Sequence, residues 1–356
     1  MMFRRLRNRP ARFSDRPEFR AIAKGIASAV AAMILAGCGV SRQDNFSYPS
    51  FYPGNEKIIF TYTKVGEPST LVTYDLVSNR HHIHERQKID PDDRYWGSGS
   101  VSDDGRKIVF SIGQEGTYNS QLAIMNVDGT GLRKITNSPG LRAGPSFSPD
   151  GRRIIYLFAS GERRSPRRPV IGLDVFEIDI ATGKETRLTD YEFYSASKPS
   201  YLPDGESFIF SGDGTAKIPI GSYEKQYQNN TIFVMKKNSE NKLIPFIQRR
   251  SYSNNPSISS DGSKILFTSI SYDRSLPETT YPETTYDLFI WNRGEITQLT
   301  RGQIVSGSSI SPDGSRVVFV KGEFGRNPKR TLWVMNSDGS DLTEIPFPPT
   351  HRASAP

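Results

Sequence analysis

The amino-acid sequence predicts an all-β fold, a six-bladed β-propeller with four antiparallel strands in each blade. Three observations lead to this prediction: a segment that recurs six times, an Asp- and Gly-rich turn inside the copies, and three consecutive apolar residues after each turn. The chain of 356 residues holds 30 Gly and 24 Pro, and 11% of its residues are aromatic. Such a composition favours many short strands joined by turns over long helices.

The repeated segment is nine residues long and ends in an aromatic residue. Its copies lie 46 to 57 residues apart, a period typical of propellers, solenoids and arrays. In the first copy Asn55 replaces the glycine of the other five, and Asn tolerates a positive φ better than other non-glycine residues, so the same turn is expected there. The copies are YPGNEKIIF (52–60), SDDGRKIVF (102–110), SPDGRRIIY (148–156), LPDGESFIF (202–210), SSDGSKILF (259–267) and SPDGSRVVF (311–319).

Each copy is expected to join the first two strands of a blade. A short first strand enters from a loop, the turn reverses the chain, and the apolar triplet forms a second strand that is buried on both faces. A third strand follows at a variable distance, and a turn with a short fourth strand, such as residues 181–189, closes the unit. The third strands are expected at residues 71–76, 121–126, 174–179, 231–236, 287–292 and 331–336.

These repeats resemble the TolB-type propeller repeat, in which an SPDG turn, an aromatic-ended second strand and a third strand such as LWVMN (332–336) recur. The resemblance covers residues 46–346 and implies a propeller; it implies much less about function. In TolB an α/β domain precedes the propeller. Because only Gly39 to Asn45 separate Cys38 from the first expected strand, we expect that domain to be missing here.

The first 37 residues are expected to be an export signal. An Arg-rich stretch precedes the weakly apolar run GIASAVAAMILAG (25–37), which is too short to span a bilayer as a helix. The junction Leu35-Ala36-Gly37-Cys38 resembles the bacterial lipobox, in which the cysteine is acylated and becomes the mature N-terminus. A lone buried cysteine in an uncleaved leader is the alternative. Glycine at the position after the cysteine, Gly39, resembles the pattern of lipoproteins that are sent to the outer membrane.

The expected organisation is therefore a signal peptide (1–37), a lipid-anchored tether (38–45), the propeller (46–346) and a flexible tail (347–356). The protein is expected to be exported and held by its lipid in the cell envelope, at the outer membrane and facing the periplasm. The net charge is +8, but residues 1–37 carry eight basic and two acidic residues. The positive and negative charges of the mature chain are thus nearly equal in number, and no nucleic-acid partner is expected.

Antiparallel geometry predicts which face of the propeller binds a partner. The loops between second and third strands emerge on the same face as the connections between blades, and we call this the long-loop face; its longest segments are residues 160–173, 211–230 and 268–286. Tyr, Trp and Arg side chains, which dominate interface hot spots, are frequent there. The candidate binding residues are Tyr95, Trp96, Arg142, Arg163, Arg164, Arg167, Arg168, Tyr223, Tyr227, Arg249, Tyr252, Tyr272, Tyr281 and Tyr286.

No catalytic motif is recognisable, so we expect a non-catalytic scaffold that binds a cell-envelope protein or, alternatively, a glycan, as a monomeric propeller. His81, His82 and His84 cluster in the first repeat without an acidic or cysteine partner at ligand spacing, so an exposed polar strand, no metal and no cofactor are expected. The Gly-x-Ser-x-Gly elbow and the phosphate-loop motif are missing from the sequence. A metal-dependent polysaccharide lyase or hydrolase that uses the central funnel is the alternative.

Overall fold

The structure is a computed structural model, and all of its described residues are strands, turns or irregular segments. No helix among them is long and apolar enough to cross a membrane. Residues 1–43, with the expected signal peptide and Cys38, and the tail from 348 lie outside the described part. The described residues are 44–85, 93–114, 119–160, 172–215, 231–237, 244–246, 253–271, 285–323 and 329–347.

The described residues form 24 strands. The first twelve are β1 (Asn45–Phe51), β2 (Lys57–Thr63), β3 (Thr70–Asp75), β4 (His81–Ile83), β5 (Tyr95–Val101), β6 (Lys107–Gly113), β7 (Ser120–Asn126), β8 (Arg133–Lys134), β9 (Leu141–Phe147), β10 (Arg153–Ala159), β11 (Asp174–Asp179) and β12 (Glu185–Arg187). The second twelve are β13 (Phe193–Tyr201), β14 (Ser207–Thr215), β15 (Thr231–Lys236), β16 (Ile244–Pro245), β17 (Ser253–Ile258), β18 (Lys264–Ser271), β19 (Thr285–Asn292), β20 (Glu295–Gln298), β21 (Ile304–Ile310), β22 (Arg316–Gly322), β23 (Arg330–Asn336) and β24 (Thr343–Ile345).

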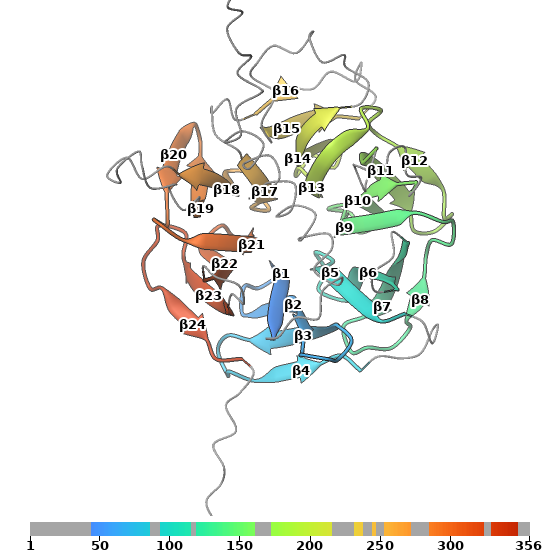
Figure 1. Ribbon diagram of the computed structural model, residues 1–356. Helices are drawn as coiled ribbons and strands as arrows, with labels where there is room; N and C mark the ends of the chain where they lie inside the picture. The colour runs from blue at the N-terminus through green and yellow to red at the C-terminus, as the bar shows by residue number, and fades with distance from the viewer. Residues whose placement is uncertain are drawn as a thin grey trace, which may run out of the picture. The chain divides into compact units, whose positions relative to one another are not determined.

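These strands confirm an all-β propeller. Strands β1–β4, β5–β8, β9–β12 and β13–β16 form four four-stranded antiparallel sheets, and β17–β24 form an eight-stranded sheet. That larger sheet consists of two further antiparallel units of four strands, which join at the single parallel pair Tyr286 and Ile304. In Figure 1 the first strand of each unit lies nearest the centre and the fourth lies at the periphery.

Side-chain hydrogen bonds explain why the repeated segment turns. Ser311 Oγ donates to Asp313 Oδ1 at 2.6 Å and accepts the backbone N–H of Arg316 at 2.9 Å. Gly314 between them has a φ of +71°, which a residue without Cβ adopts at little cost. Ser102, Ser148 and Ser259 repeat both bonds in their own turns. The expectation for Asn55 is confirmed, because its φ is +64°.

A basic residue at the start of the second strand ties three of the turns to the next repeat. Lys264 Nζ donates to the backbone oxygen of Gly314 at 2.8 Å, and Arg153 Nη2 donates to that of Gly205 at 3.1 Å. Arg316 Nη1 makes the corresponding contact with Asn55 at 3.5 Å, between the last repeat and the first. The repeated sequence therefore encodes contacts between units as well as the turn within each one.

The hydrophobic core lies between neighbouring sheets. The triplet Ile58, Ile59 and Phe60 is fully buried, because its side chains alternate between the two faces of a sheet that is covered on both sides. One cluster joins the first unit to the last and contains Phe46, Phe60, Val318, Val334 and nine further buried residues of these two units. The ring is closed by apolar packing, which leaves the loops free to differ in length and sequence.

Candidate functional site

The topology places the three longest connections at one edge of the sheets. Residues 160–173 join β10 to β11, residues 216–230 join β14 to β15, and residues 272–284 join β18 to β19. In antiparallel units this edge is also the one at which the chain enters the first strand of the next unit. Most predicted binding residues fall outside the described part of the chain: Arg163, Arg164, Arg167, Arg168, Tyr223, Tyr227, Arg249, Tyr252, Tyr272 and Tyr281.

Two buried aspartates brace the base of the long-loop face. Asp174, the first residue of β11, accepts the Thr189 hydroxyl at 2.7 Å and the backbone N–H of Tyr191 at 2.8 Å. Asp287 in β19 accepts the Thr300 hydroxyl at 2.9 Å in the same way. Each of the two threonine hydroxyls also accepts a backbone N–H of its third strand. These bonds hold the segments that lead into the next unit, at residues 189–191 and 300–303, against the sheet.

Tyr95 and Tyr286 are the two predicted binding residues that are partly exposed in the described part of the chain. Tyr95 lies opposite Gly113 at the end of β6, and Tyr286 lies opposite Ile270 near the end of β18. Both tyrosines therefore lie at the edge from which the long connections leave. The side chain of Tyr95 covers Gly97, where a Cβ would come within 2.0 Å of the Tyr95 hydroxyl oxygen.

Trp96 is not a surface residue, and the prediction that it belongs to the binding face is corrected here. Its side chain is 1% exposed and packs in a hydrophobic cluster with Ile108 and Ile112. The ring centroid lies 4.8 Å from that of Phe110. Trp96 is the second residue of its first strand and fills the space between two sheets, so it contributes to the core rather than to a partner interface.

Arg142 is also buried, which removes it from the candidate surface. Its guanidinium donates to the Ser138 hydroxyl at 2.6 Å and backbone oxygen at 2.8 Å, and it pairs with Glu185 at 3.2 Å. It also lies over the ring of Phe158, 4.8 Å from the centroid. A buried charge is tolerated when it is paired and hydrogen-bonded in this way, so Arg142 has a structural role.

The histidine cluster lies on the outermost strand of the first unit. His81 and His82 are exposed as expected, but His84 is 1% exposed, and one of its ring nitrogens, Nε2, lies 2.8 Å from the Thr73 hydroxyl. Burial lowers the pKa of His84 to about 4, and the nearby His82 adds to this effect. Within the described ranges, no three His, Cys, Asp or Glu side chains are grouped closely enough to hold a metal ion.

The first strands lie nearest the centre of the ring in Figure 1, and a bulge interrupts each of them. In five of these strands the bulge covers two residues, the second of which is Pro or Gly, and in β21 it lies at Ser306. At five of these positions the backbone has a positive φ, which is strained for a residue with a side chain. The five residues are Tyr48, Ser98, Gly144, Lys198 and Asn255.

Neighbouring bulges contact one another. A Cβ at Gly144 would lie 3.7 Å from the backbone of Lys198, and one at Gly307 would lie 3.5 Å from that of Tyr48. The Tyr48 hydroxyl bonds to Tyr95, and burial is the main reason that the pKa values of both tyrosines are raised. Bulged strands aim side chains out of the sheet, and the sequence pattern gave no sign of them.

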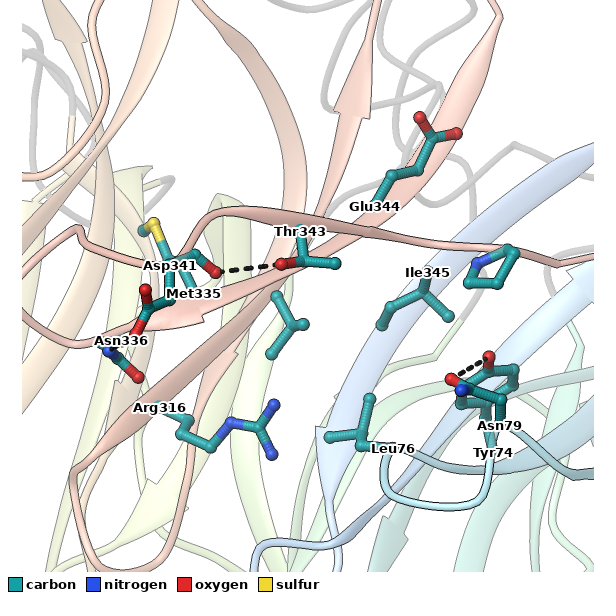
Figure 2. A pocket seen from close by; sticks show the side chains of 12 residues that line it. Tyr74, Leu76, Asn79, Arg316, Met335, Asn336, Asp341, Thr343, Glu344 and Ile345 are labelled. Carbon is teal, nitrogen blue, oxygen red and sulfur yellow. Dashed lines mark hydrogen bonds between the residues drawn. The ribbon is translucent and has the colours of Figure 1, made fainter.

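A groove lies on the opposite side of the ring, among the tight turns. It has a volume of about 390 Å³ and runs between the first and last units, as Figure 2 shows. The Tyr74 hydroxyl donates to Asn79 Oδ1 at 3.1 Å on one side, and the turn after β23 forms the other. The lining residues are Tyr74, Leu76, Asn79, Arg316, Val334, Met335, Asn336, Asp341, Thr343, Glu344, Ile345 and Pro346.

Comparison with known proteins agrees with the propeller. No protein-family model matches the chain. The chain is 26% identical over 267 residues to the Tol-Pal system protein TolB of Francisella tularensis subsp. holarctica (strain OSU18), a match that covers 74% of this chain and 53% of the relative. The chain thus spans about half the length of the curated relatives it matches. The chain is a β-propeller that is distantly similar to TolB.

Solved structures share the fold at lower identity. The crystal structure of TolB from Acinetobacter baumannii has a TM-score of 0.56 at 20% identity, and the match covers 93% of this chain and 69% of that one. Oligogalacturonate lyase in complex with manganese has a TM-score of 0.52 at 15% identity, covering 84% of this chain and 76% of the lyase. TolB and an enzyme therefore share this architecture, and the fold by itself does not distinguish their functions.

Proposed function

We propose that this protein is a non-catalytic scaffold of the cell envelope that binds another envelope protein through its long-loop face. The observation that carries the proposal is the asymmetry of the propeller. Tight turns occupy one edge of the sheets, whereas connections rich in Tyr and Arg leave the other edge from a base braced by Asp174 and Asp287. Similarity to TolB, a Tol-Pal system protein, supports a place in the envelope.

We also propose that the propeller has six blades and a lipid anchor. The eight-stranded sheet is held together across its middle by one residue pair, which supports counting it as two blades of four strands. The lipobox ending at Cys38 supports acylation of that cysteine, and Gly39 supports delivery to the outer membrane. A Cys38→Ser variant should lose labelling by radioactive palmitate and leave the membrane fraction, and persistent labelling would refute the anchor.

Affinity capture from native membranes, followed by mass spectrometry, tests the binding face. Replacing Arg163, Arg164, Arg167 and Arg168 together with alanine should remove the captured partner, because these side chains supply the positive charge of the connection between β10 and β11. The variant should keep its circular dichroism spectrum and melting temperature, since connections of this kind contribute little to the core.

A matched variant of the opposite side controls for total charge. Arg106, Arg133, Arg152 and Lys184 are exposed residues of turns and outer strands, and their replacement with alanine removes the same number of positive charges. This variant should capture the partner as well as the native protein does. Loss of the partner in both variants would point to a general charge effect, and loss in the control alone would move the interface to the turn side.

The alternative is a metal-dependent polysaccharide lyase or hydrolase, and its one structural support is the fold shared with oligogalacturonate lyase. Metal analysis of the purified protein separates the two functions. Stoichiometric Mn, Zn or Ca, together with cleavage of a polysaccharide that a chelator abolishes, would favour the enzyme over the scaffold.

A further inference from the structure

The groove between the first and last units contains a basic side chain, Arg316, that is bound less fully than its counterparts. Arg153, Lys264 and Arg316 each begin a second strand, and each donates to a backbone oxygen of the next repeat. The bond from Arg153 is 3.1 Å long and that from Lys264 is 2.8 Å long. The bond from Arg316 Nη1 to Asn55 is 3.5 Å long, at the outer limit for a hydrogen bond. The Arg316 guanidinium therefore retains donors for another acceptor.

Polar side chains complete the bonding of the two counterparts. Between the third and fourth units, Glu177 pairs with Arg153 at 3.8 Å and also with Lys237, the residue that follows β15. Between the fifth and sixth units, Lys264 Nζ donates to the hydroxyl of Ser337 at 2.9 Å, and Ser337 is the residue that follows β23. At both junctions the space beside the basic residue is thus occupied by polar groups of the protein itself.

Apolar residues replace these polar groups beside Arg316. The position of Glu177, opposite the third residue of a second strand, is taken by Val334 in the last unit. The position of Lys237 and Ser337, directly after a third strand, is taken by Leu76 in the first unit. Val334 and Leu76 both line the groove, and neither side chain can accept a hydrogen bond. The junction between the last unit and the first therefore combines an open space with a basic residue that its neighbours do not satisfy.

The two carboxylates that line the groove do not neutralise Arg316. Asp341 Oδ2 accepts a hydrogen bond from Asn336 Nδ2 at 2.6 Å, and the exposed Glu344 side chain extends away from Arg316 in Figure 2. Among the described residues, no carboxylate forms an ion pair with Arg316. A guanidinium binds a carboxylate through two parallel N–H bonds, so the groove favours a ligand that supplies a carboxylate to Arg316.

Exposed apolar side chains flank the groove on both sides. Val77 is 71% exposed and follows Leu76 in the first unit, and Leu342 is 52% exposed and lies immediately before β24 in the last unit. Single exposed apolar residues are common on surfaces, but two that face each other across a groove are typical of a protein interaction site. A small acid would fill the groove without covering these rims. An extended peptide carries a carboxylate and apolar side chains on one chain, so it fits both features.

We propose that this groove binds an extended segment of a partner protein in which an acidic side chain is flanked by apolar ones. The carboxylate of the segment pairs with Arg316, and its apolar side chains cover Val77 and Leu342. This inference goes beyond the proposed scaffold function, because the groove lies among the tight turns and the long-loop face lies on the other side of the ring.

Saturation-transfer NMR on the purified full-length protein tests the proposal. The probes are acetylated tripeptide amides with Glu at the centre and Val, Leu, Ile or Phe on either side. Each is used at about 1 mM, because one charge pair and a small apolar area give weak affinity. The native protein should transfer saturation to the apolar side chains of a Glu peptide. The matching Gln peptide should receive at least about fivefold less, since the charge-assisted bond is lost.

Two arginine variants locate the charge that binds the peptide. Arg316→Met should reduce transfer to the Glu peptide at least about fivefold and should remove the difference between the Glu and Gln peptides, because the two changes delete the same interaction. Arg152→Met removes an exposed arginine from a turn of the third unit and should change neither result.

The exposed rims supply a second test that does not depend on the folding of the Arg316 variant. Replacing Val77 and Leu342 together with serine changes exposed side chains and should reduce transfer to every Glu peptide. Val65 and Ile296 are 42% and 39% exposed and lie away from the groove, so their joint replacement with serine is the matched control and should leave transfer unchanged.

Several results would overturn the proposal. They are the lack of transfer from the native protein to any Glu peptide, equal transfer to Glu and Gln peptides, and a folded Arg316→Met variant that still prefers Glu. Stronger transfer to isovalerate than to every peptide would make a small carboxylic acid the occupant. A dimer of the native protein in analytical ultracentrifugation, lost when Val77 and Leu342 are replaced with serine, would make a second copy of the chain the occupant.

Discussion

Arg330 Nη1 donates a hydrogen bond to Asn45 Oδ1 at 2.8 Å, although 285 residues separate them in the sequence. Asn45 is the first residue of β1 and Arg330 is the first residue of β23, so the bond joins the first unit of the ring to the last. It accompanies the apolar cluster that contains Phe46, Val320 and Leu332. Closure of this propeller therefore rests on side-chain contacts between two separate sheets.

Replacement of Arg330 with methionine should lower the free energy of unfolding by about 1 kcal/mol, because a partly buried, charge-assisted hydrogen bond is lost while the apolar stem is kept. Chemical denaturation followed by tryptophan fluorescence measures this change. Arg152→Met, at an exposed turn position, should have almost no effect. If the two variants are equally stable, the bond does not contribute to ring closure.

Two turn glycines form a matched pair for a second prediction. Gly151 and Gly314 have φ values of +67° and +71°, so alanine is strained at both, at a cost of about 1 kcal/mol. A Cβ at Gly151 would meet nothing within 4 Å, whereas one at Gly314 would lie 3.2 Å from Lys264 Cδ. Gly314→Ala should therefore destabilise the protein more than Gly151→Ala in thermal melts, and the reverse order would contradict the interlocking of the turns.

The repeated pattern was sufficient to predict the strands because it reports local chemistry. The Ser-x-Asp-Gly turn, the buried triplet such as Ile58 to Phe60, and the positive φ of Asn55 all depend on neighbours in the sequence. Trp96 and Arg142 were assigned to the surface because their segments connect blades. Their burial depends on Phe110 and Glu185, which lie in other strands, and no local pattern reports those contacts.

Arg142 should prove to be a stability residue. Arg142→Met should lower the free energy of unfolding by about 3 kcal/mol, because Glu185 and the groups around Ser138 lose a buried ionic partner. Partner capture should be unchanged at a temperature where the variant remains folded. A variant of native stability that loses its partner would return Arg142 to the binding face.

His84 should make stability depend on pH. The fold holds the neutral imidazole and lowers the pKa of His84 to about 4, so between pH 6.5 and 4 the unfolded chain binds the proton more readily than the folded one. The free energy of unfolding should fall by about 2 kcal/mol as the pH drops through this window, with no further loss from His84 below it. Denaturation of His84→Gln should show a flatter slope there, and an unchanged slope would exclude His84 as the source. His81→Gln, at an exposed position, is the control.

The contacts of Lys198 and the burial of His84 could not be predicted from the sequence for a related reason. Lys198 precedes a proline in a segment that resembles a loop entry, and its position follows from a bulge and from the acceptor Ser308 on β21, 110 residues away. The sequence did predict that one edge of the sheets carries tight turns and the other carries long connections, because the lengths of the loops can be read from the sequence directly. It also supplied the aromatic and basic residues of the long connections, whose partner it does not encode.

Site-specific photo-cross-linking tests the binding face most directly. The cross-linking amino acid p-benzoylphenylalanine, placed at Tyr286 beside the long connections or at Lys184 in the turn between β11 and β12, reports contact with a partner in native membranes. The scaffold proposal predicts a cross-linked envelope protein from position 286 and none from position 184. Cross-links from position 184 alone would contradict it.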